Sequence, residues 1–296
     1  MTDNKIYCGD ALEVLKTFPD DSVHCCATSP PYFGLRDYEA EGQLGLESSP
    51  HQYIHALKEI FHEMKRVLRS DGTLWLNIGD SYAGSGSNKV KYMPEKEGWG
   101  KIKPKDMIGI PWTLAFSLRD DGWYLRSDII WQKTNGMPEQ VQDRPTKSYE
   151  HIFLLTKSRK YYYDADAIAE PICQESIERA KRMKSRKSKY ENISQYQSIY
   201  HTHVNQIRTV RNKRDVWTFS TNSYRFNGHF AMYPEKLIEP CILAGSPVGG
   251  VVIDPFLGSG TTAAAAKRLG RRFIGIDINP KYCEAAQARV DAVMAG

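Results

Sequence analysis

Several features that would place this chain in a membrane or among secreted proteins are missing from the sequence. It contains no apolar run approaching the roughly 20 residues that a membrane span needs. Its first ten residues, MTDNKIYCGD, hold no apolar stretch of the signal-peptide kind. Hydrophobic residues at 41% and charged residues at 25% are too abundant for a disordered chain. We therefore expect a folded, cytoplasmic protein that does not associate with a membrane.

The cysteines also lack the spacing that a zinc site or a disulfide framework would show. The six cysteines form no Cys-x-x-Cys pair and have no clustered histidines beside them; they are Cys8, Cys25, Cys26, Cys173, Cys241 and Cys283. A zinc site needs such clustering, and a disulfide framework needs an oxidising compartment. The sequence thus predicts scattered reduced thiols and no metal cofactor.

Positive charge is concentrated in one part of the chain. The net charge is +5, yet residues 157–225 alone carry 15 Lys and Arg against 7 Asp and Glu. The excess of eight in that segment leaves a net −3 for all other residues. A basic segment on a near-neutral body suits a polyanion such as nucleic acid, because phosphate contacts release counterions. A merely solvated basic surface is the alternative interpretation.

Hydrophobic periodicity predicts alternating strands and helices. Strands are expected at residues 5–8, 22–27, 73–78, 124–131, 151–156, 251–253 and 273–276. Helices are expected at residues 11–16, 52–68, 110–118, 234–244, 261–269 and 280–294, and residues 70–72 are expected to form a turn. This alternation predicts an α/β fold with a mostly parallel sheet and helices on both faces.

The periodicity weakens in two places. Residues 158–228 are rich in Lys, Arg, Ser, Tyr and Asn, and we interpret them as an insertion between a first half, 1–157, and a second half, 229–296. Residues 81–105 are rich in glycine and lysine without periodicity. A loop of that length is either a functional lid or disordered.

A glycine turn follows a buried strand near the C-terminus, in the segment VVIDPFLGSGTT from Val251 to Thr262. Gly258 and Gly260 allow positive φ and a close approach of a ligand to the start of the next helix. Asp254 ends the strand, and Asp277 ends the next strand 23 residues later, which suits a ribose. The third glycine of dinucleotide sites is missing, so a nucleoside ligand without a pyrophosphate fits better. A structural turn is the alternative.

A second motif, Thr28-Ser29-Pro30-Pro31-Tyr32-Phe33-Gly34, ends a buried strand near the N-terminus. Two prolines stop the strand and fix the backbone where α/β sheets place their ligands. The Ser29 hydroxyl and the Pro30 carbonyl would then be fixed acceptors beside the Tyr32 ring. Such a site suits an amine on a flat ring, although Pro-Pro-Tyr alone is more often a simple turn.

Together the two motifs resemble the amino-methyltransferases of DNA, whose catalytic motif is (Ser/Asn/Asp)-Pro-Pro-(Tyr/Phe). The catalytic motif precedes a variable basic region and then the cofactor loop, an order similar to that of the family's β class. Further matching pieces are CGD at 8–10, DIIWQK at 128–133, RPTKSYE at 144–150 and HFAMYP at 229–234. The resemblance implies a Rossmann-like fold that depends on S-adenosyl-L-methionine. It also implies a circularly permuted motif order and a target-recognition insertion.

The resemblance also implies roles for individual residues. The catalytic residues would be Ser29, Pro30, Pro31 and Tyr32. The cofactor would be bound by Asp10, Thr28, His229, Phe230, Asp254, Pro255, Phe256, Gly258, Ser259, Gly260, Thr261, Thr262 and Asp277. Within that set, Asp10 would lie near the adenine and Asp277 would take the ribose hydroxyls. From the concentration of positive charge rather than from the resemblance, the residues expected to contact DNA phosphates are Arg144, Lys147, Lys181, Arg182, Lys184, Arg186, Lys187, Arg211, Lys213 and Arg214.

The expected reaction is methyl transfer to the N4 amine of cytosine in duplex DNA after base flipping. Adenine N6 is the runner-up, because Ser at position 29 is typical of cytosine-N4 members and Asp is commoner in adenine-N6 members. A protein or small-molecule methyltransferase and an inactive DNA-binding module are the remaining alternatives. Double-stranded DNA is the expected partner, and a homodimer and a cognate restriction endonuclease stay open.

Overall fold

The computed structural model describes residues 1–84, 102–185, 209–221 and 233–293. These residues form two compact units. The larger unit comprises Met1–Asp164 and Asp215–Gly296, and the smaller one Ala165–Arg214. The smaller unit lies within the segment 158–228, which the sequence predicted as an insertion, but it is shorter at both ends.

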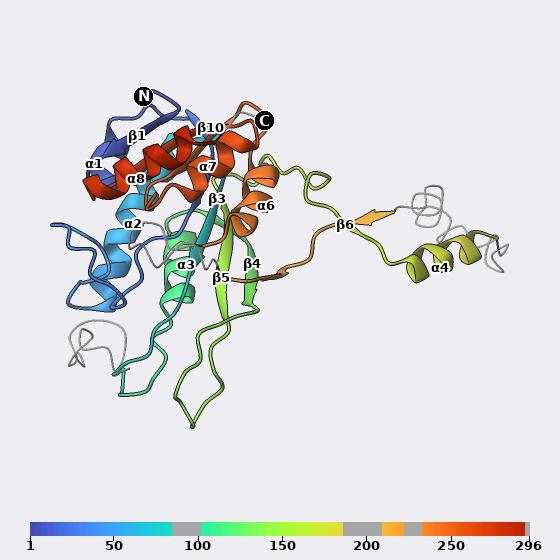
Figure 1. The fold of residues 1–296 in the computed structure, drawn as a ribbon, viewed down its shortest axis with the longest axis horizontal. Helices are drawn as coiled ribbons and strands as arrows, with labels where there is room; N and C mark the ends of the chain where they lie inside the picture. The colour runs from blue at the N-terminus through green and yellow to red at the C-terminus, as the bar shows by residue number, and fades with distance from the viewer. Residues whose placement is uncertain (85–101, 186–208, 222–232, 294–296) are drawn as a thin grey trace. The chain divides into compact units, whose positions relative to one another are not determined.

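One mixed sheet organises the larger unit (Figure 1). Its strand order is β1-β10-β9-β2-β3-β5-β4-β8. Neighbouring strands from β1 to β3 pair in parallel, β5 is antiparallel to both β3 and β4, and β8 is parallel to β4. The strands are β1 (Lys5–Cys8), β2 (Val23–Thr28), β3 (Leu68–Ile78), β4 (Tyr124–Lys133), β5 (Tyr149–Thr156), β8 (Val216–Phe219), β9 (Val251–Asp254) and β10 (Arg272–Asp277). The prediction of a mostly parallel α/β sheet is confirmed.

Helices cover both faces of this sheet, as expected. One layer contains α1 (Ala11–Lys16), α2 (Pro50–Val67) and α3 (Ile110–Asp120), which contact one another in that order. The other layer contains α6 (Glu235–Gly245), α7 (Thr261–Arg268) and α8 (Pro280–Asp291), which also pack in series. The smaller unit holds α4 (Gln174–Ser185) and a short antiparallel pair, β6 (Glu170–Pro171) with β7 (Val210–Arg211).

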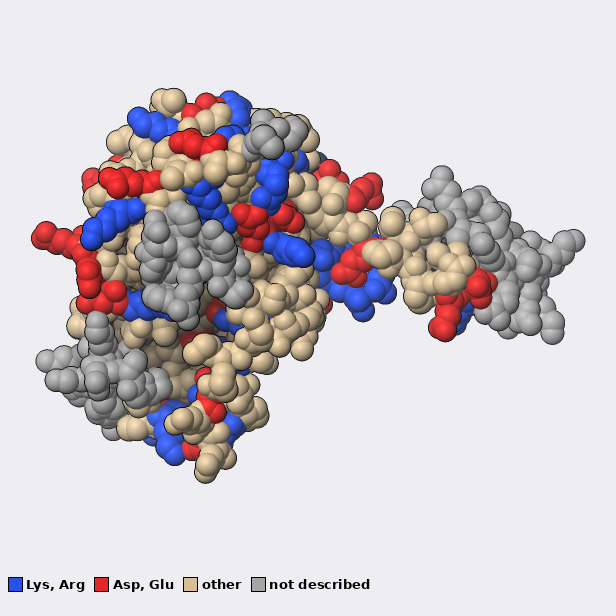
Figure 2. Space-filling model, viewed as in Figure 1, with Lys and Arg blue, Asp and Glu red and all other residues tan. Residues whose placement is uncertain are grey.

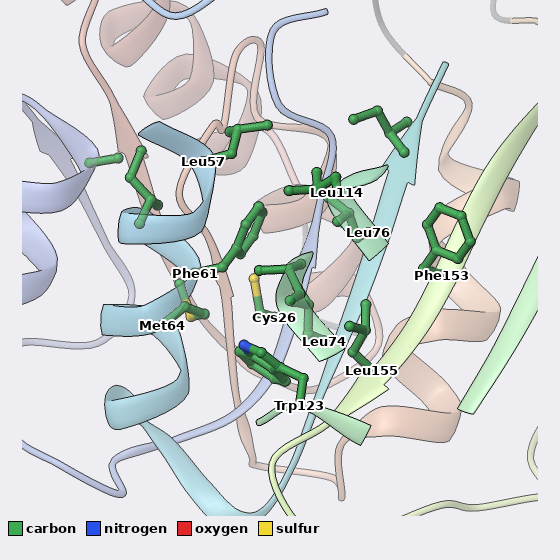
Figure 3. Close-up of a cluster of buried hydrophobic side chains, with 14 of the residues drawn as sticks. Cys26, Leu57, Phe61, Met64, Leu74, Leu76, Leu114, Trp123, Phe153 and Leu155 are labelled. Atoms are coloured by element: carbon green, nitrogen blue, oxygen red, sulfur yellow. The ribbon is translucent and has the colours of Figure 1, made fainter. Parts of the chain in front are cut away.

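The α2 layer is held to the sheet by a stripe of apolar side chains at helical spacing. Leu57, Phe61 and Met64 of α2 are fully buried, and Figure 3 shows them facing Leu74 and Leu76 of β3. The helix starts sharply because the Ser49 side chain accepts a hydrogen bond from the backbone N–H of Gln52 and a proline follows at the first turn. Such a cap stabilises a helix by about 1 kcal/mol. This packing fixes the strands from which the site residues emerge.

Two local details differ from the sequence-based prediction. Strand β3 begins at Leu68, so the predicted turn at residues 70–72 forms instead an irregularity where the register with β2 shifts. Strand β8 lies in the segment predicted as an insertion, yet it pairs with β4 in the main sheet. Its Trp217 is 3% exposed and packs against Trp75, with ring centroids 6.4 Å apart. Four residues in a basic segment give too short a pattern for a strand to be predicted.

All six cysteines are free thiols, as the sequence suggested. Among the described residues, no helix combines the length and apolar character needed to cross a bilayer.

Candidate active site

The site lies at one edge of the sheet because of how the strands run. Since β1, β10, β9, β2 and β3 are all parallel, their carboxyl ends meet at the same edge. Strand β9 leads into α7 on one face, whereas β2 leads towards α2 on the other. Neighbouring strands whose connections leave to opposite faces open a crevice at this edge. The glycine bend, residues 255–260, follows β9, and the proline turn, residues 29–34, follows β2. Both therefore border that crevice.

A single cavity at this edge is lined by both motifs. Of the residues singled out from the sequence, those lining it are Asp10, Ser29, Pro31, Pro255, Phe256, Gly258, Ser259, Thr261 and Asp277. Segments more than two hundred residues apart in the sequence therefore converge on one cavity. A flat substrate and a nucleoside ligand could meet there.

Four other residues of the predicted cofactor set are absent from the cavity lining: Thr28, Asp254, Gly260 and Thr262. The fully buried Asp254 carboxylate accepts hydrogen bonds from the hydroxyls of Thr28 and Thr262, both at 2.6 Å. It also accepts from the Tyr233 hydroxyl at 3.0 Å and the Phe256 N–H at 3.0 Å. Burial raises the pKa of Asp254, and these donors partly offset the rise. Asp254 thus ties the ends of β2 and β9 to the start of α7.

The glycine bend requires glycine at a specific point. Gly260 has φ of 85°, and a Cβ there would lie 2.9 Å from the Cα of Ala286 in α8. Helix α7 begins directly after Gly260, and no side chain caps its N-terminus; Thr261, its first residue, lines the cavity. Arg289 of α8 holds the bend by donating to the Thr261 hydroxyl at 2.9 Å.

Asp277 presents a carboxylate to the same cavity. One of its oxygens accepts from the Gly258 N–H and the other from the Asn279 N–H, each at 2.8 Å. Burial raises the pKa of Asp277 to about 6, although the two backbone donors lower it. At neutral pH the group is therefore mostly ionised and remains a strong hydrogen-bond acceptor.

Side chains from α2 and β5 hold the proline turn in place. The Tyr53 hydroxyl of α2 donates to the Pro31 carbonyl at 2.6 Å. Tyr32 is absent from the cavity lining; its hydroxyl donates to Glu150 Oε2 of β5 at 2.7 Å. The Ser29 hydroxyl donates to the Tyr32 hydroxyl at 3.4 Å.

The other lining residues were not foreseen from the sequence as site residues: Ala11, Tyr38, Gly42, Gln43, Leu44, Ile60, Tyr233, Leu257, Ile278, Asn279 and Tyr282. The segment around Tyr38 lies beside the start of α8, because Asn279 Nδ2 donates to the Tyr38 carbonyl at 3.2 Å. The rings of Tyr38 and Tyr282 meet edge to face with centroids 6.3 Å apart. Ile278 and Asn279 directly follow Asp277 and could have been predicted, whereas the Tyr38 segment has no periodicity to interpret.

Comparisons with known proteins agree with this architecture. The family model described as DNA methylase, N6_N4_Mtase, matches residues 23–288. The chain belongs to this DNA methylase family. It is 44% identical to the Type II methyltransferase M.Cfr9I of Citrobacter freundii, over 95% of this chain and 86% of that protein.

Solved structures share the fold of this DNA methylase. The PvuII DNA methyltransferase (cytosine-N4-specific) matches with a TM-score of 0.68 and 18% identity, covering 98% of this chain and 86% of that one. TTHA0409 from Thermus thermophilus, complexed with S-adenosyl-L-methionine, matches with a TM-score of 0.61 and 27% identity. That match covers 98% of this chain and 96% of that one.

Two of the residues predicted to contact DNA, Arg144 and Lys147, lie in the connection between β4 and β5, at the same edge of the sheet as the cavity. The Arg144 guanidinium bonds Glu139 at 2.7 Å and stacks over the Tyr82 ring, 3.8 Å from its centroid. Lys147 donates to the Asp80 carbonyl at 2.8 Å, and burial lowers the pKa of this lysine. Both side chains therefore also hold this connection in place.

The other predicted DNA contacts belong to the smaller unit. Arg211, Lys213 and Arg214 surround Glu170 at 3.4, 3.7 and 3.2 Å. On the face of the larger unit in Figure 2, basic and acidic side chains are interspersed. The side chains of Lys181, Arg182 and Lys184 fall outside the described part, as do Arg186, Lys187, His229 and Phe230. Across the described ranges, no cluster of three or more His, Cys, Asp or Glu is suited to a metal ion.

Proposed function

We propose that this DNA methylase transfers the methyl group of S-adenosyl-L-methionine to the N4 amine of cytosine in duplex DNA, after extruding the base from the helix. The observation that carries the proposal is the single cavity that Ser29 and Pro31 share with Gly258, Ser259 and Asp277. Ser29, one of the two proposed acceptors of the amine, is thereby adjacent to the proposed nucleoside site, and Pro30, the other, lies between two lining residues.

The residues around the glycine bend fit this cofactor. Asp277 offers an ionised carboxylate to the two hydroxyls of a ribose, and its backbone donors keep both oxygens oriented. The uncapped start of α7 and the φ of 54° at Gly258 suit a close-lying polar chain such as the methionine moiety. Asp10 lines the same cavity after β1, on the side where the adenine would lie. The similar protein TTHA0409 was solved in complex with S-adenosyl-L-methionine, which supports the choice of cofactor.

The chemistry divides between the cofactor and the proline turn. S-adenosyl-L-methionine supplies an electrophilic methyl group on a sulfonium. The lone pair of a base amine is delocalised into its ring, so the amine needs help to react. Ser29 Oγ and the Pro30 carbonyl accept its two N–H bonds and favour a tetrahedral nitrogen. Holding this nitrogen in line with the methyl group supplies much of the acceleration.

Tyr32 and the basic residues offset the free-energy cost of extruding the base. Stacking on an aromatic ring is worth about 1–3 kcal/mol per base. That offsets part of the cost of unstacking, a few kcal/mol, and phosphate contacts offset more. The phosphate contacts that we propose are Arg144 and Lys147, at the same edge of the sheet as the cavity, and Arg211, Lys213 and Arg214 in the smaller unit.

Ser29 at the start of the turn favours cytosine over adenine, as in the cytosine-N4 members that this motif resembles. The test is to incubate the enzyme with unmodified genomic DNA and methyl-labelled S-adenosyl-L-methionine, and to identify the labelled nucleoside by mass spectrometry. We expect N4-methylcytosine. N6-methyladenine would overturn the assignment to cytosine, and DNA without label would overturn the proposed function. Modification-sensitive sequencing of the same DNA gives the recognition site.

A further inference from the structure

A chain of hydrogen bonds leads away from the proposed catalytic serine. Ser29 Oγ donates to Tyr32 Oη over a long 3.4 Å. Tyr32 Oη lies 2.7 Å from Glu150 Oε2 and 3.3 Å from Asn77 Oδ1, so the nearer Glu150 carboxylate is the stronger acceptor of its proton. Both hydroxyls therefore donate in the same direction, towards the carboxylate. If Ser29 accepts an N–H of the base amine, the series runs unbroken from the amine to Glu150. Hydrogen bonds aligned in this way polarise and strengthen one another.

The Glu150 carboxylate is positioned to accept the last hydrogen bond of this series. Its second oxygen, Oε1, is paired with the Lys133 ammonium of β4. Asn77 Nδ2 of β3 donates to Oε2 at 3.2 Å and to the His151 carbonyl at 3.1 Å. The Glu150 side chain is only 12% exposed. The ammonium compensates the carboxylate's negative charge, so a proton acceptor is held ready away from bulk water.

Tyr32 is built to pass a proton rather than to keep a charge. Burial first, and then the Glu150 carboxylate, raise the pKa of Tyr32 well above its ordinary value. The hydroxyl can therefore release its proton only as it receives another from Ser29. The ring packs closely against the backbone of Gly79, where an added Cβ would lie 2.7 Å from Tyr32 Cε2, so the absence of a side chain at Gly79 leaves room for it.

We infer that Ser29, Tyr32 and Glu150 form a proton relay that takes the proton from the base amine as the methyl group arrives. This inference rests on the proposed function. The nitrogen–carbon bond forms while the sulfur–carbon bond breaks, giving S-adenosylhomocysteine. The amine proton passes to Ser29, the Ser29 proton to Tyr32, and the Tyr32 proton to Glu150. Glu150 ends as a neutral carboxylic acid, the donor has lost its positive charge, and solvent later removes the proton.

The test uses single-turnover methyl transfer on a duplex that carries the recognition site, with cofactor and DNA saturating. Tyr32→Phe keeps the ring and removes the relay hydroxyl; Glu150→Gln keeps the shape and removes the proton acceptor. Each should lower the rate about 10²-fold, the scale of acid–base catalysis, with little change in the Kd of either substrate. The double variant should be no slower than the slower single variant, because both changes break one chain.

Matched controls lie outside the site. Tyr124→Phe changes a 46% exposed tyrosine at the far end of β4, and Glu59→Gln changes an exposed carboxylate on α2. Both should keep the wild-type rate. Replacing water with D₂O should slow wild-type transfer but leave the residual transfer of Tyr32→Phe nearly unchanged. A purely structural hydrogen bond would not produce that difference.

The outcomes separate the relay from the proposed function. If wild-type enzyme methylates DNA but both variants keep rates within about twofold, the relay is wrong and the function stands. If the variants instead lose DNA affinity and keep the saturated rate, Glu150 only orients Tyr32 and the relay is again wrong. If Glu150→Gln fails to fold, Tyr32→Phe alone decides by the same criteria. Absence of methyl transfer by the wild type refutes the function itself.

Discussion

The two turns that form the cavity are stabilised in contrasting ways. Most partners of the glycine bend are close in sequence, since Asp254 bonds Phe256 and Thr262 and Gly258 bonds Asp277, 19 residues away. The bond from Thr28 of β2 to Asp254 is the long-range exception. The proline turn has one partner at a similar separation, Tyr53 on the Pro31 carbonyl 22 residues away, but its tyrosine depends on Glu150, 118 residues away in β5. The bend that we propose for the cofactor is therefore formed largely by one stretch of the chain, whereas the turn that we propose for the base needs β5 beside it.

The largest expected effect is on the proline turn, which we propose binds the base. Ser29→Ala should lower the rate of methyl transfer on the order of 10²–10³-fold, because one positioned polar partner of the amine is lost. Cofactor affinity should stay unchanged, since Ser29 does not belong to the glycine bend. Single-turnover assays with labelled cofactor and calorimetry measure the two quantities.

Ser22→Ala is a matched control, because Ser22 lies just before the opposite end of β2 and bonds the Pro19 carbonyl. It should behave like the wild type. A near wild-type rate for Ser29→Ala would remove Ser29 from the mechanism and leave the proline turn as a scaffold only.

The next largest effect is on Asp277 beside the glycine bend, which we propose binds the cofactor. Asp277→Asn should weaken cofactor binding about 10- to 100-fold, the range expected when hydrogen bonds to a charged group are lost. Because the pKa of Asp277 is raised to about 6, wild-type affinity should be full above pH 7 and fall as the pH drops through 6. Calorimetry between pH 5 and pH 8 measures both trends.

In Asp277→Asn the affinity should depend much less on pH over this range. An equally steep pH dependence in the variant would assign the titration to another group, and unchanged affinity would separate Asp277 from the cofactor.

A third change tests whether the glycine bend is fixed by backbone geometry. Gly260→Ala places a Cβ at positive φ against Ala286 of α8, so about 1–3 kcal/mol of stability should be lost. Chemical denaturation measures this loss. Gly109→Ala is the matched control, because Gly109 has a similar φ of 82° and a Cβ added there would meet nothing within 4 Å. Equal losses in the two variants would show that the contact with α8 contributes nothing.

The smallest expected effect concerns the smaller unit. Arg214→Ala should weaken DNA binding only a few-fold and lower the slope of log affinity against log salt by about 1, the signature of one phosphate contact. Fluorescence anisotropy with a labelled duplex over a salt series measures it. Arg119→Ala, which changes an exposed arginine at the end of α3, should leave the slope unchanged. An unchanged slope for Arg214→Ala as well would exclude Arg214 from the DNA contacts.

The same contrast explains what the sequence could predict. The β9 strand, the glycine bend and Asp277 lie within 27 consecutive residues, so local patterns place them together. The proline turn could be recognised as a motif, but its partners could not, because Glu150 and Asn77 meet Tyr32 only after β3 and β5 pair. Strand β8 was missed for the same reason: its burial against Trp75 follows from pairing with β4.

The central claim is that the proline turn faces a methyl donor lodged in the glycine bend, and a crystal structure of the enzyme with S-adenosyl-L-methionine tests it most directly. The account predicts the ribose hydroxyls on Asp277 and the methyl group pointing towards Ser29 and Pro30. The gap between them should leave a base amine about 3–3.5 Å from the methyl carbon. A cofactor bound elsewhere, or one whose methyl group points away from the proline turn, would contradict the account.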